Sequence, residues 1–211
     1  MIMRVHRILR ETAAEGPGIR YCVWVQGCSH HCPGCFAPDT WDPEEGQWIE
    51  IEELKEDLRR AIESAKQKGK KLEGLTLLGG EPFDQAKEAA KLAKEAKKHG
   101  LSVLTFTGYR MEDLEKKGHE ETELLEATDL LIDGPFEEDK KSFNRPLAGS
   151  ANQRFLFLTD RYNREDILSL KNSFEIRIDP DGRIWINGMG DFEALRNCEK
   201  RRHSSNEISW D

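Results

Sequence analysis

The sequence of 211 residues has no apolar run long enough to cross a membrane, and its first residues contain no apolar segment of the kind that directs secretion. An excess of positive charge is also missing, because 32 Lys and Arg stand against 40 Asp and Glu, for a formal net charge of -8. An acidic chain is a poor ligand for nucleic-acid phosphates. We therefore expect a cytoplasmic protein that binds neither nucleic acid nor membrane.

Cysteine is scarce, yet three of the five cysteines fall within one segment of eight residues. Cys28, Cys32 and Cys35 have the spacing Cys-x3-Cys-x2-Cys. Such clustering favours metal binding over disulfides, because the cytosol keeps thiols reduced. The cysteines alone are compatible with zinc, completed by a nearby histidine, and equally with an iron–sulfur cluster that has one iron without a protein ligand.

The two other cysteines suggest no ligand role. Cys22 lies within an apolar run at residues 21–26 and is expected to be a buried core thiol. Cys198 stands alone beside the basic residues 200–202, and we interpret it as incidental rather than as a fourth ligand.

Apolar runs alternate with amphipathic segments along the first 135 residues. This alternation indicates parallel strands joined by helical crossovers, with helices covering the sheet. The expected fold is α/β, a partial (β/α) barrel of mainly parallel strands with a C-terminal β-hairpin extension. The predicted strands are residues 21–26, 74–78, 101–106 and 129–133, and the predicted helices are 49–68, 84–99 and 111–127, the last interrupted at Gly118.

Four loops that are candidates for ligand binding follow predicted strands. Because ligands gather at the carboxyl ends of parallel strands, we expect these loops to share one rim. Each loop also has a purely structural interpretation: the glycines suit a tight turn, and Glu81 suits a helix cap. The four loops are the cysteine segment, Gly-Gly-Glu-Pro at 79–82, Thr-Gly-Tyr at 107–109 and Asp-Gly-Pro at 133–135.

The second half of the chain is less informative. Residues 137–154 are polar and long enough for a functional loop or lid. Residues 174–186 alternate around a turn signal at 179–182 and predict a β-hairpin. We therefore expect a core at residues 1–158 and a C-terminal extension of uncertain role at residues 159–211.

The sequence resembles radical S-adenosylmethionine enzymes, and among them the activating enzymes of anaerobic (class III) ribonucleoside-triphosphate reductase. In most radical S-adenosylmethionine enzymes an aromatic residue precedes the third cysteine, whereas here that position is Gly34 and the aromatic Phe36 follows it, as in the reductase-activating group. Gly-Gly-Glu-Pro alone is a modest signal, and its order with the cysteines makes it specific. The matching segments are residues 15–20, 27–42, 77–82, 107–109, 129–136 and 149–154.

The resemblance implies a site with two cofactors. Cys28, Cys32 and Cys35 would ligate three irons of a [4Fe–4S] cluster, and the amine and carboxylate of S-adenosylmethionine would chelate the fourth. The implied cofactor contacts are Gly79, Gly80 and Glu81 for the amine, Gly34 and Phe36 against the bound cofactor, and Thr107 and Asp133 for the ribose or amino-acid part.

The resemblance also implies an activity. The enzyme would cleave S-adenosylmethionine reductively to a 5′-deoxyadenosyl radical and generate a glycyl radical on a partner such as anaerobic ribonucleotide reductase. A flavodoxin or ferredoxin would donate the electron. Two alternatives remain at this point: a radical S-adenosylmethionine enzyme that modifies a small molecule or peptide, and a zinc-binding interaction module.

Overall fold

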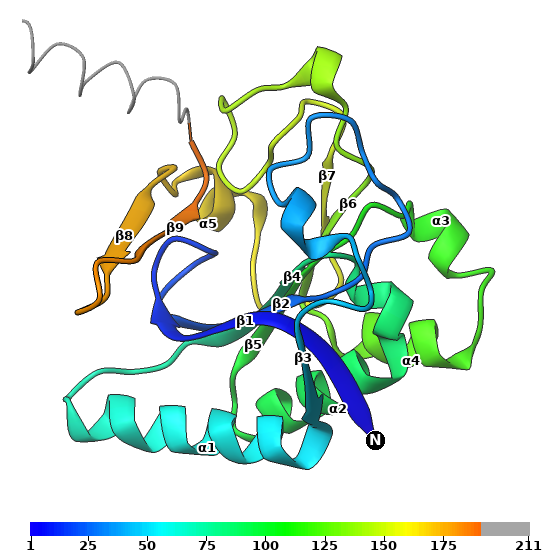
Figure 1. The fold of residues 1–211 in the computed structure, drawn as a ribbon. Coiled ribbons are helices and arrows are strands. Elements are labelled where there is room, and N and C mark those ends of the chain that lie inside the picture. The colour runs from blue at the N-terminus through cyan, green and yellow to red at the C-terminus, as the bar shows by residue number, and fades with distance from the viewer. Residues whose placement is uncertain (191–211) are drawn as a thin grey trace, which may run out of the picture.

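The structure, a computed structural model, describes residues 1–190 of the chain. It has a mixed α/β fold with a seven-stranded sheet and a separate two-stranded hairpin (Figure 1). The strands are β1 (Ile2–Thr12), β2 (Arg20–Val25), β3 (Gln47–Glu50), β4 (Gly74–Gly79), β5 (Ser102–Phe106), β6 (Leu130–Asp133), β7 (Arg154–Phe157), β8 (Phe174–Ile178) and β9 (Ile184–Gly188). The helices are α1 (Ile51–Gln67), α2 (Ala86–Lys98), α3 (Met111–Leu114), α4 (His119–Ala127) and α5 (Arg164–Leu168), with short 3-10 turns at Pro38–Thr40, Pro82–Gln85 and Glu138–Lys140.

The sheet has a parallel centre and antiparallel edges. Its strand order is β3-β1-β2-β4-β5-β6-β7, in which β2, β4, β5 and β6 pair in parallel. β1 and β7 run in the opposite direction at either side of this centre. The four predicted strands are the four central ones, so the prediction of mainly parallel strands and of a C-terminal hairpin is confirmed.

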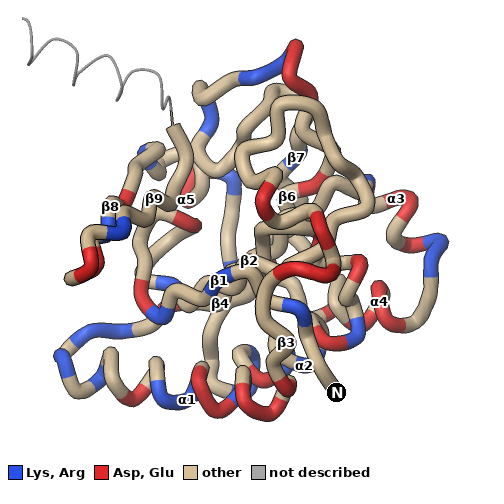
Figure 2. The backbone as a smooth tube through the Cα atoms, in the orientation of Figure 1, with Lys and Arg blue, Asp and Glu red and all other residues tan. Residues whose placement is uncertain are grey.

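Helices α1, α2 and α4 cover one face of the sheet. Their apolar stripes form a continuous core with alternate residues of the central strands, such as Val23, Leu77 and Val103, all fully buried. The outer sides of the helices carry interleaved acidic and basic residues, which Figure 2 shows along α1. Pairs such as Lys55–Glu52, 2.7 Å apart, confine the charge to the solvated side. Among the helices of residues 1–190, none has the length and apolar character needed to span a bilayer.

The second face of the sheet carries the opposite set of side chains. Cys22, Trp24 and Leu78 form a small cluster there, beside a second cluster around Leu104 and Ile132. Cys22 is fully buried, as predicted, and burial raises the pKa of its thiol. Cys198 lies outside the described residues.

Three strands were not predicted, and β1 shows why. Met3 and Val5 point to the helical face, but an irregularity in the pairing with β2 between Val5 and Arg7 shifts the alternation. Ile8 then points to the helical face, whereas Arg7 stacks on Trp24 at the other face. A strand whose alternation changes phase in the middle gives no clear period-2 signal. β3 and β7 have only four residues each.

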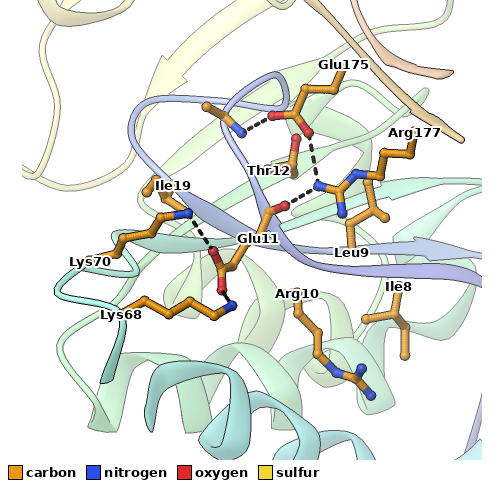
Figure 3. Close-up of a pocket in the computed structure, with 11 residues that line it drawn as sticks. Ile8, Leu9, Arg10, Glu11, Thr12, Ile19, Lys68, Lys70, Glu175 and Arg177 are labelled. Carbon is orange, nitrogen blue, oxygen red and sulfur yellow. Dashed lines mark hydrogen bonds and ion pairs between the residues drawn. The ribbon is translucent and has the colours of Figure 1, made fainter. Parts of the chain in front are cut away.

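The C-terminal hairpin of β8 and β9 is joined to the core by polar contacts. Glu175 accepts a hydrogen bond of 2.7 Å from the backbone of Ala13, and Arg177 donates to the carbonyl oxygen of Glu11. Figure 3 shows both side chains over the end of β1, where they border a cavity of about 550 Å³. No residue of the cysteine segment lines this cavity among those described. It therefore lies away from the predicted site.

Candidate functional site

The cysteine segment is a closed loop at the carboxyl end of β2. Gly27 adopts a positive φ of 93°, which turns the chain out of the strand. The backbone of Gly27 donates to the carbonyl of Thr40 at 2.8 Å, and that of Cys28 donates to Trp41 at 3.1 Å. These bonds hold the two ends of the loop together. The three cysteines are thereby confined to one short segment, which we call the cluster loop (residues 27–41).

The three thiols of the cluster loop are free and partly exposed. A backbone hydrogen bond of 3.1 Å from Cys35 to the carbonyl of Cys32 forms a turn, and the backbone of Ala37 donates to the Sγ of Cys35 at 3.4 Å. Burial raises the pKa of the Cys28 and Cys32 thiols. Binding to a metal centre favours the thiolate form of such cysteines.

The donor set fits an iron–sulfur cluster. Within residues 1–190, no three His, Cys, Asp or Glu side chains converge on the position of a single metal ion. A [4Fe–4S] cluster binds one thiolate on each iron, so its ligands stand further apart than those of one ion. Three free thiols on a single loop, with hydrogen-bond donors such as the Ala37 amide beside them, have the chemistry that such a cluster requires.

Glu81 connects the loops that follow β4 and β5. Its side chain is 1% exposed, and its Oε1 accepts hydrogen bonds of 2.9 Å from both the Phe83 backbone and the Thr107 hydroxyl. Its Oε2 accepts a bond of 2.8 Å from the backbone of Gly108. His30 of the cluster loop lies 3.3 Å from the same oxygen, and the contact with Glu81 raises the pKa of His30. The expected shared rim is therefore present in the structure.

The two glycines before Glu81 lie against the chain's own backbone. Gly79 has a φ of 98°, and a Cβ there would come within 2.8 Å of the Cα of Trp24. A Cβ on Gly80 would lie 2.2 Å from the carbonyl oxygen of Gly27. Glycine is thus required at both positions, at Gly79 to bring the end of β4 against β2 and at Gly80 to bring it against the cluster loop. Their part in binding an amine stays a prediction.

Three rim residues, Ser29, Asp84 and Tyr109, were missed as candidates, although they lie within or next to the quoted motifs, and His30 was considered only as a possible zinc ligand. The backbone of Ser29 donates to Asp84 at 2.8 Å, and the Tyr109 hydroxyl donates to the same carboxylate at 2.9 Å. The ring of His30 packs edge-on against Tyr109, with 4.3 Å between centroids, and its Cδ2 would lie 2.5 Å from a Cβ on Gly108. These contacts fix the cluster loop on the rim.

Gly34 and Phe36 flank the third cysteine and have different surroundings. Gly34 has a φ of 70°, and a Cβ on it would lie 2.7 Å from the Cδ of Glu138. Phe36 is 42% exposed and packs against Phe136 with 5.1 Å between ring centroids. Phe36 thus forms part of an aromatic wall, whereas Gly34 allows a tight turn under the loop at residues 137–154.

Asp133 is fully buried at the end of β6. Its Oδ1 accepts a hydrogen bond of 2.8 Å from Arg154, and its Oδ2 accepts one of 2.8 Å from the backbone of Met111. Arg154 also binds Glu112 at 2.8 Å, which ties the start of β7 to α3. Asp133 and Thr107 both lie on the rim, where their bonds hold neighbouring loops, and their contact with a cofactor stays a prediction.

A cavity of about 380 Å³ opens beside the cluster loop on the second face of the sheet. Cys35, Phe36 and Gly79 line it together with Trp24 and Phe106 of the sheet. Residues 184–189, from the C-terminal hairpin and the position after it, line one side of the cavity. The predicted site residues that do not line it are Cys28, Cys32, Gly34, Gly80, Glu81, Thr107 and Asp133, which lie in the neighbouring loops.

Glu15 lies at the hairpin side of this cavity and is 6% exposed. Its Oε1 accepts hydrogen bonds from the backbone of Gly188 at 2.6 Å and from the amide of Asn187 at 3.4 Å. Burial raises the pKa of Glu15 to about 7, although both hydrogen bonds and the nearby Arg7 favour the charged form. Glu15 thus connects the segment that follows β1 to β9.

Comparison with known proteins identifies relatives. The family described as 4Fe-4S single cluster domain matches residues 14–156. The anaerobic ribonucleoside-triphosphate reductase-activating protein of Enterobacteria phage T4 is 30% identical over 78% of this chain and 100% of its own length. The protein of the same name from Escherichia coli K12 is 28% identical over 72% of this chain and 96% of its own length. A solved structure, QueE from Escherichia coli, aligns with a TM-score of 0.39 and 18% identity over 51% of this chain and 53% of that chain, a likeness too small to support an argument.

The match spans about two thirds of the chain and includes β2, the cluster loop and the strands that carry the rim. The hairpin of β8 and β9 lies beyond the matched residues. The resemblance found in the sequence is thereby confirmed: the chain belongs to the 4Fe-4S single cluster domain family and is a homologue of the anaerobic ribonucleoside-triphosphate reductase-activating proteins.

Proposed function

We propose that this protein is a radical S-adenosylmethionine enzyme that generates a glycyl radical on an anaerobic ribonucleotide reductase. The observation that carries the proposal is the cluster loop, which presents three free thiols beside a cavity on the rim of the sheet. The family match and the relatives' shared name support the same function.

A bound [4Fe–4S] cluster would supply the one-electron chemistry of reductive S-adenosylmethionine cleavage, and a glycine Cα of the partner would be the source of the hydrogen atom. Cys28, Cys32 and Cys35 would hold three of the irons. The protein's remaining tasks are to orient S-adenosylmethionine and to keep water and other reactants away from the radical. The aromatic side chains Phe36 and Phe106 of the cavity suit the second task.

The rim supplies the groups for orientation. We assign Gly79, Gly80 and Glu81 to the methionyl amine, because a carboxylate attracts an ammonium group and each of its oxygens has two lone pairs. Oε2 of Glu81 accepts a backbone hydrogen bond from Gly108 and lies 3.3 Å from Nε2 of His30, so the amine would take the place of His30 on this oxygen. The assigned neighbours of the bound cofactor are Gly34 and Phe36, with Thr107 and Asp133 toward the ribose or amino-acid part.

The proposal extends to the architecture and setting of the enzyme. We infer a core at residues 1–158 built as a partial (β/α) barrel around the cavity, and an extension at residues 159–211, of which residues 191–211 lie outside the description. Free thiols and a reduced cluster require reducing conditions, which supports the cytoplasm as the compartment. A flavodoxin or ferredoxin is the proposed electron donor.

The cluster assignment is tested by single substitutions under anaerobic conditions. Cys35→Ala is expected to lose the iron–sulfur absorbance and the formation of 5′-deoxyadenosine from S-adenosylmethionine with dithionite. Cys22→Ala is the matched control, because this cysteine is buried in the sheet outside the cluster loop, and it should keep both. Colourless wild-type protein with stoichiometric zinc and no affinity for S-adenosylmethionine would refute the proposal.

The activity is tested with the anaerobic ribonucleotide reductase of the same organism. Incubation with reductant and S-adenosylmethionine should give the doublet of a glycyl radical in the electron paramagnetic resonance spectrum, and omission of S-adenosylmethionine should remove it. Formation of 5′-deoxyadenosine without any glycyl radical would preserve the radical chemistry and exclude the reductase as the partner.

A further inference from the structure

The C-terminal hairpin forms one wall of the cavity that reaches the cluster loop. Cys35, Phe36 and Gly79 line one part of this cavity, and six consecutive residues at 184–189 line another. Successive side chains of a strand point to opposite faces. A run of consecutive residues therefore borders a cavity along the edge of the strand, where the backbone itself is presented.

The pairing of the hairpin shows which backbone groups this edge carries. Met189 donates to the carbonyl of Ser173 at 3.2 Å, and Asp179 donates to that of Arg183 at 2.9 Å. In an antiparallel pair, hydrogen-bonded positions alternate with non-hydrogen-bonded ones. Trp185 and Asn187 therefore bond to β8, whereas the N–H and C=O groups of Ile184 and Ile186 point away from it.

β9 is an open edge. Within residues 1–190, β9 pairs only with β8, and the backbone groups of Ile184 and Ile186 have no hydrogen-bond partner. The next position along the same edge, Gly188, donates its N–H to Glu15 at 2.6 Å. Both isoleucines are also exposed, by 62% and 40% of their surface. An open strand edge of this kind binds another extended backbone readily.

A second, independent observation at the same wall indicates a ligand. Asn187 is 4% exposed and lines the cavity, and its Nδ2 donates to Thr12 at 3.0 Å. Its Oδ1 has no hydrogen-bond partner among the described residues, and neither has the Nε of Arg7, another residue of the cavity wall. An unused acceptor and an unused donor on the wall of one cavity suit a peptide group, which carries one N–H and one C=O.

We propose that β9 is the docking strand for the substrate polypeptide, so that an extended segment of the protein partner pairs with Ile184 and Ile186 as a third strand of the hairpin. This rests on the proposed function, because the partner is the protein that receives the glycyl radical. A segment docked on β9 runs along the cavity that reaches Cys35. Glycine suits such a segment, because its backbone approaches neighbouring groups without hindrance from a side chain.

The test removes one edge donor while keeping the hairpin. Ile186→Pro deletes an N–H that β8 does not use, and proline is tolerated on edge strands. The matched control is Ile176→Pro, because Ile176 faces Ile186 in the hairpin and its N–H points to the outer edge of β8. With the anaerobic reductase as partner, we expect Ile186→Pro to lower the yield of glycyl radical per 5′-deoxyadenosine about tenfold.

The control variant Ile176→Pro should keep the wild-type ratio of glycyl radical to 5′-deoxyadenosine. An unchanged ratio in Ile186→Pro, or an equal loss in Ile176→Pro, overturns the docking assignment. Amide hydrogen exchange of the wild-type protein gives a second readout that needs no variant: partner binding should protect the amides of Ile184 and Ile186, and unchanged exchange at both refutes the proposal. Failure of wild-type protein to form any glycyl radical would refute the proposed function instead.

Discussion

Glu15 offers a direct test of the contact between core and extension, because its ionisation is opposed by burial. The side chain is 6% exposed, and burial raises its pKa from 4.5 to about 7. Between pH 4.5 and about pH 7, the folded protein therefore holds the Glu15 proton while the unfolded chain has released it. Protonated Glu15 contributes fully to the free energy of unfolding below about pH 4.5. This contribution falls as the pH rises and is lost once the pH has passed about 7.

The size of the effect follows from the two pKa values. Proton linkage with 4.5 for the unfolded chain and about 7 for the folded protein gives a loss of about 2 to 3 kcal/mol in the free energy of unfolding between pH 5 and pH 8. Glu15→Gln removes the titration and keeps an oxygen that accepts from Gly188. The variant should therefore gain stability relative to the wild type as the pH rises.

The assay is anaerobic urea unfolding of both proteins at several pH values from 5 to 8, followed by circular dichroism. The control is Glu63→Gln, a substitution on the exposed side of α1, which should leave the pH dependence of the wild type unchanged. Parallel pH profiles for Glu15→Gln and the wild type would show that Glu15 ionises without penalty and would refute the reasoning.

Two further predictions concern the core. Arg20 is fully buried and donates to Thr76 at 2.6 Å, to Ser102 at 3.0 Å and to the carbonyl of Leu75 at 2.7 Å. Arg20→Met should leave these buried acceptors unpaired and lower the free energy of unfolding, measured by urea titration, by about 3 kcal/mol. A change within about 0.5 kcal/mol, the usual range for surface substitutions, would contradict this. Leu58 of α1 is also fully buried, and Leu58→Ala should lower the free energy of unfolding by about 2 to 5 kcal/mol through the cavity left behind. Calorimetry should show a lower midpoint of thermal unfolding. An unchanged midpoint would mean that the site collapses around the smaller side chain.

The central strands were predictable because their signals are local. β2, β4, β5 and β6 are short apolar runs that end at glycine, aspartate or a polar loop, and the helices between them have clear apolar stripes. β1 could not be predicted in the same way, because its pairing irregularity after Val5 changes the phase of its alternation. That irregularity exists only in relation to a neighbouring strand.

The candidate site shows the same division. The cysteine spacing and the loops after each strand predicted the rim, because parallel strands bring their carboxyl ends to one edge. The structural reason for Gly80 was not accessible in this way, since the atom nearest to a Cβ there is the carbonyl oxygen of Gly27, which is distant in sequence. Nor was the carboxylate of Asp84 recognised as the partner of both Ser29 and Tyr109.

The sequence by itself determined a metal-binding cysteine loop, the alternation of strands and helices and the presence of a C-terminal hairpin, because each of these depends on residues close together along the chain. Only the tertiary structure decided where that hairpin lies. The hydrogen bond between Asn187 and Glu15 joins positions that are 172 residues apart, and no local pattern records it. Packing of the hairpin against β1 turns a short extension into a wall of the cavity beside Cys35.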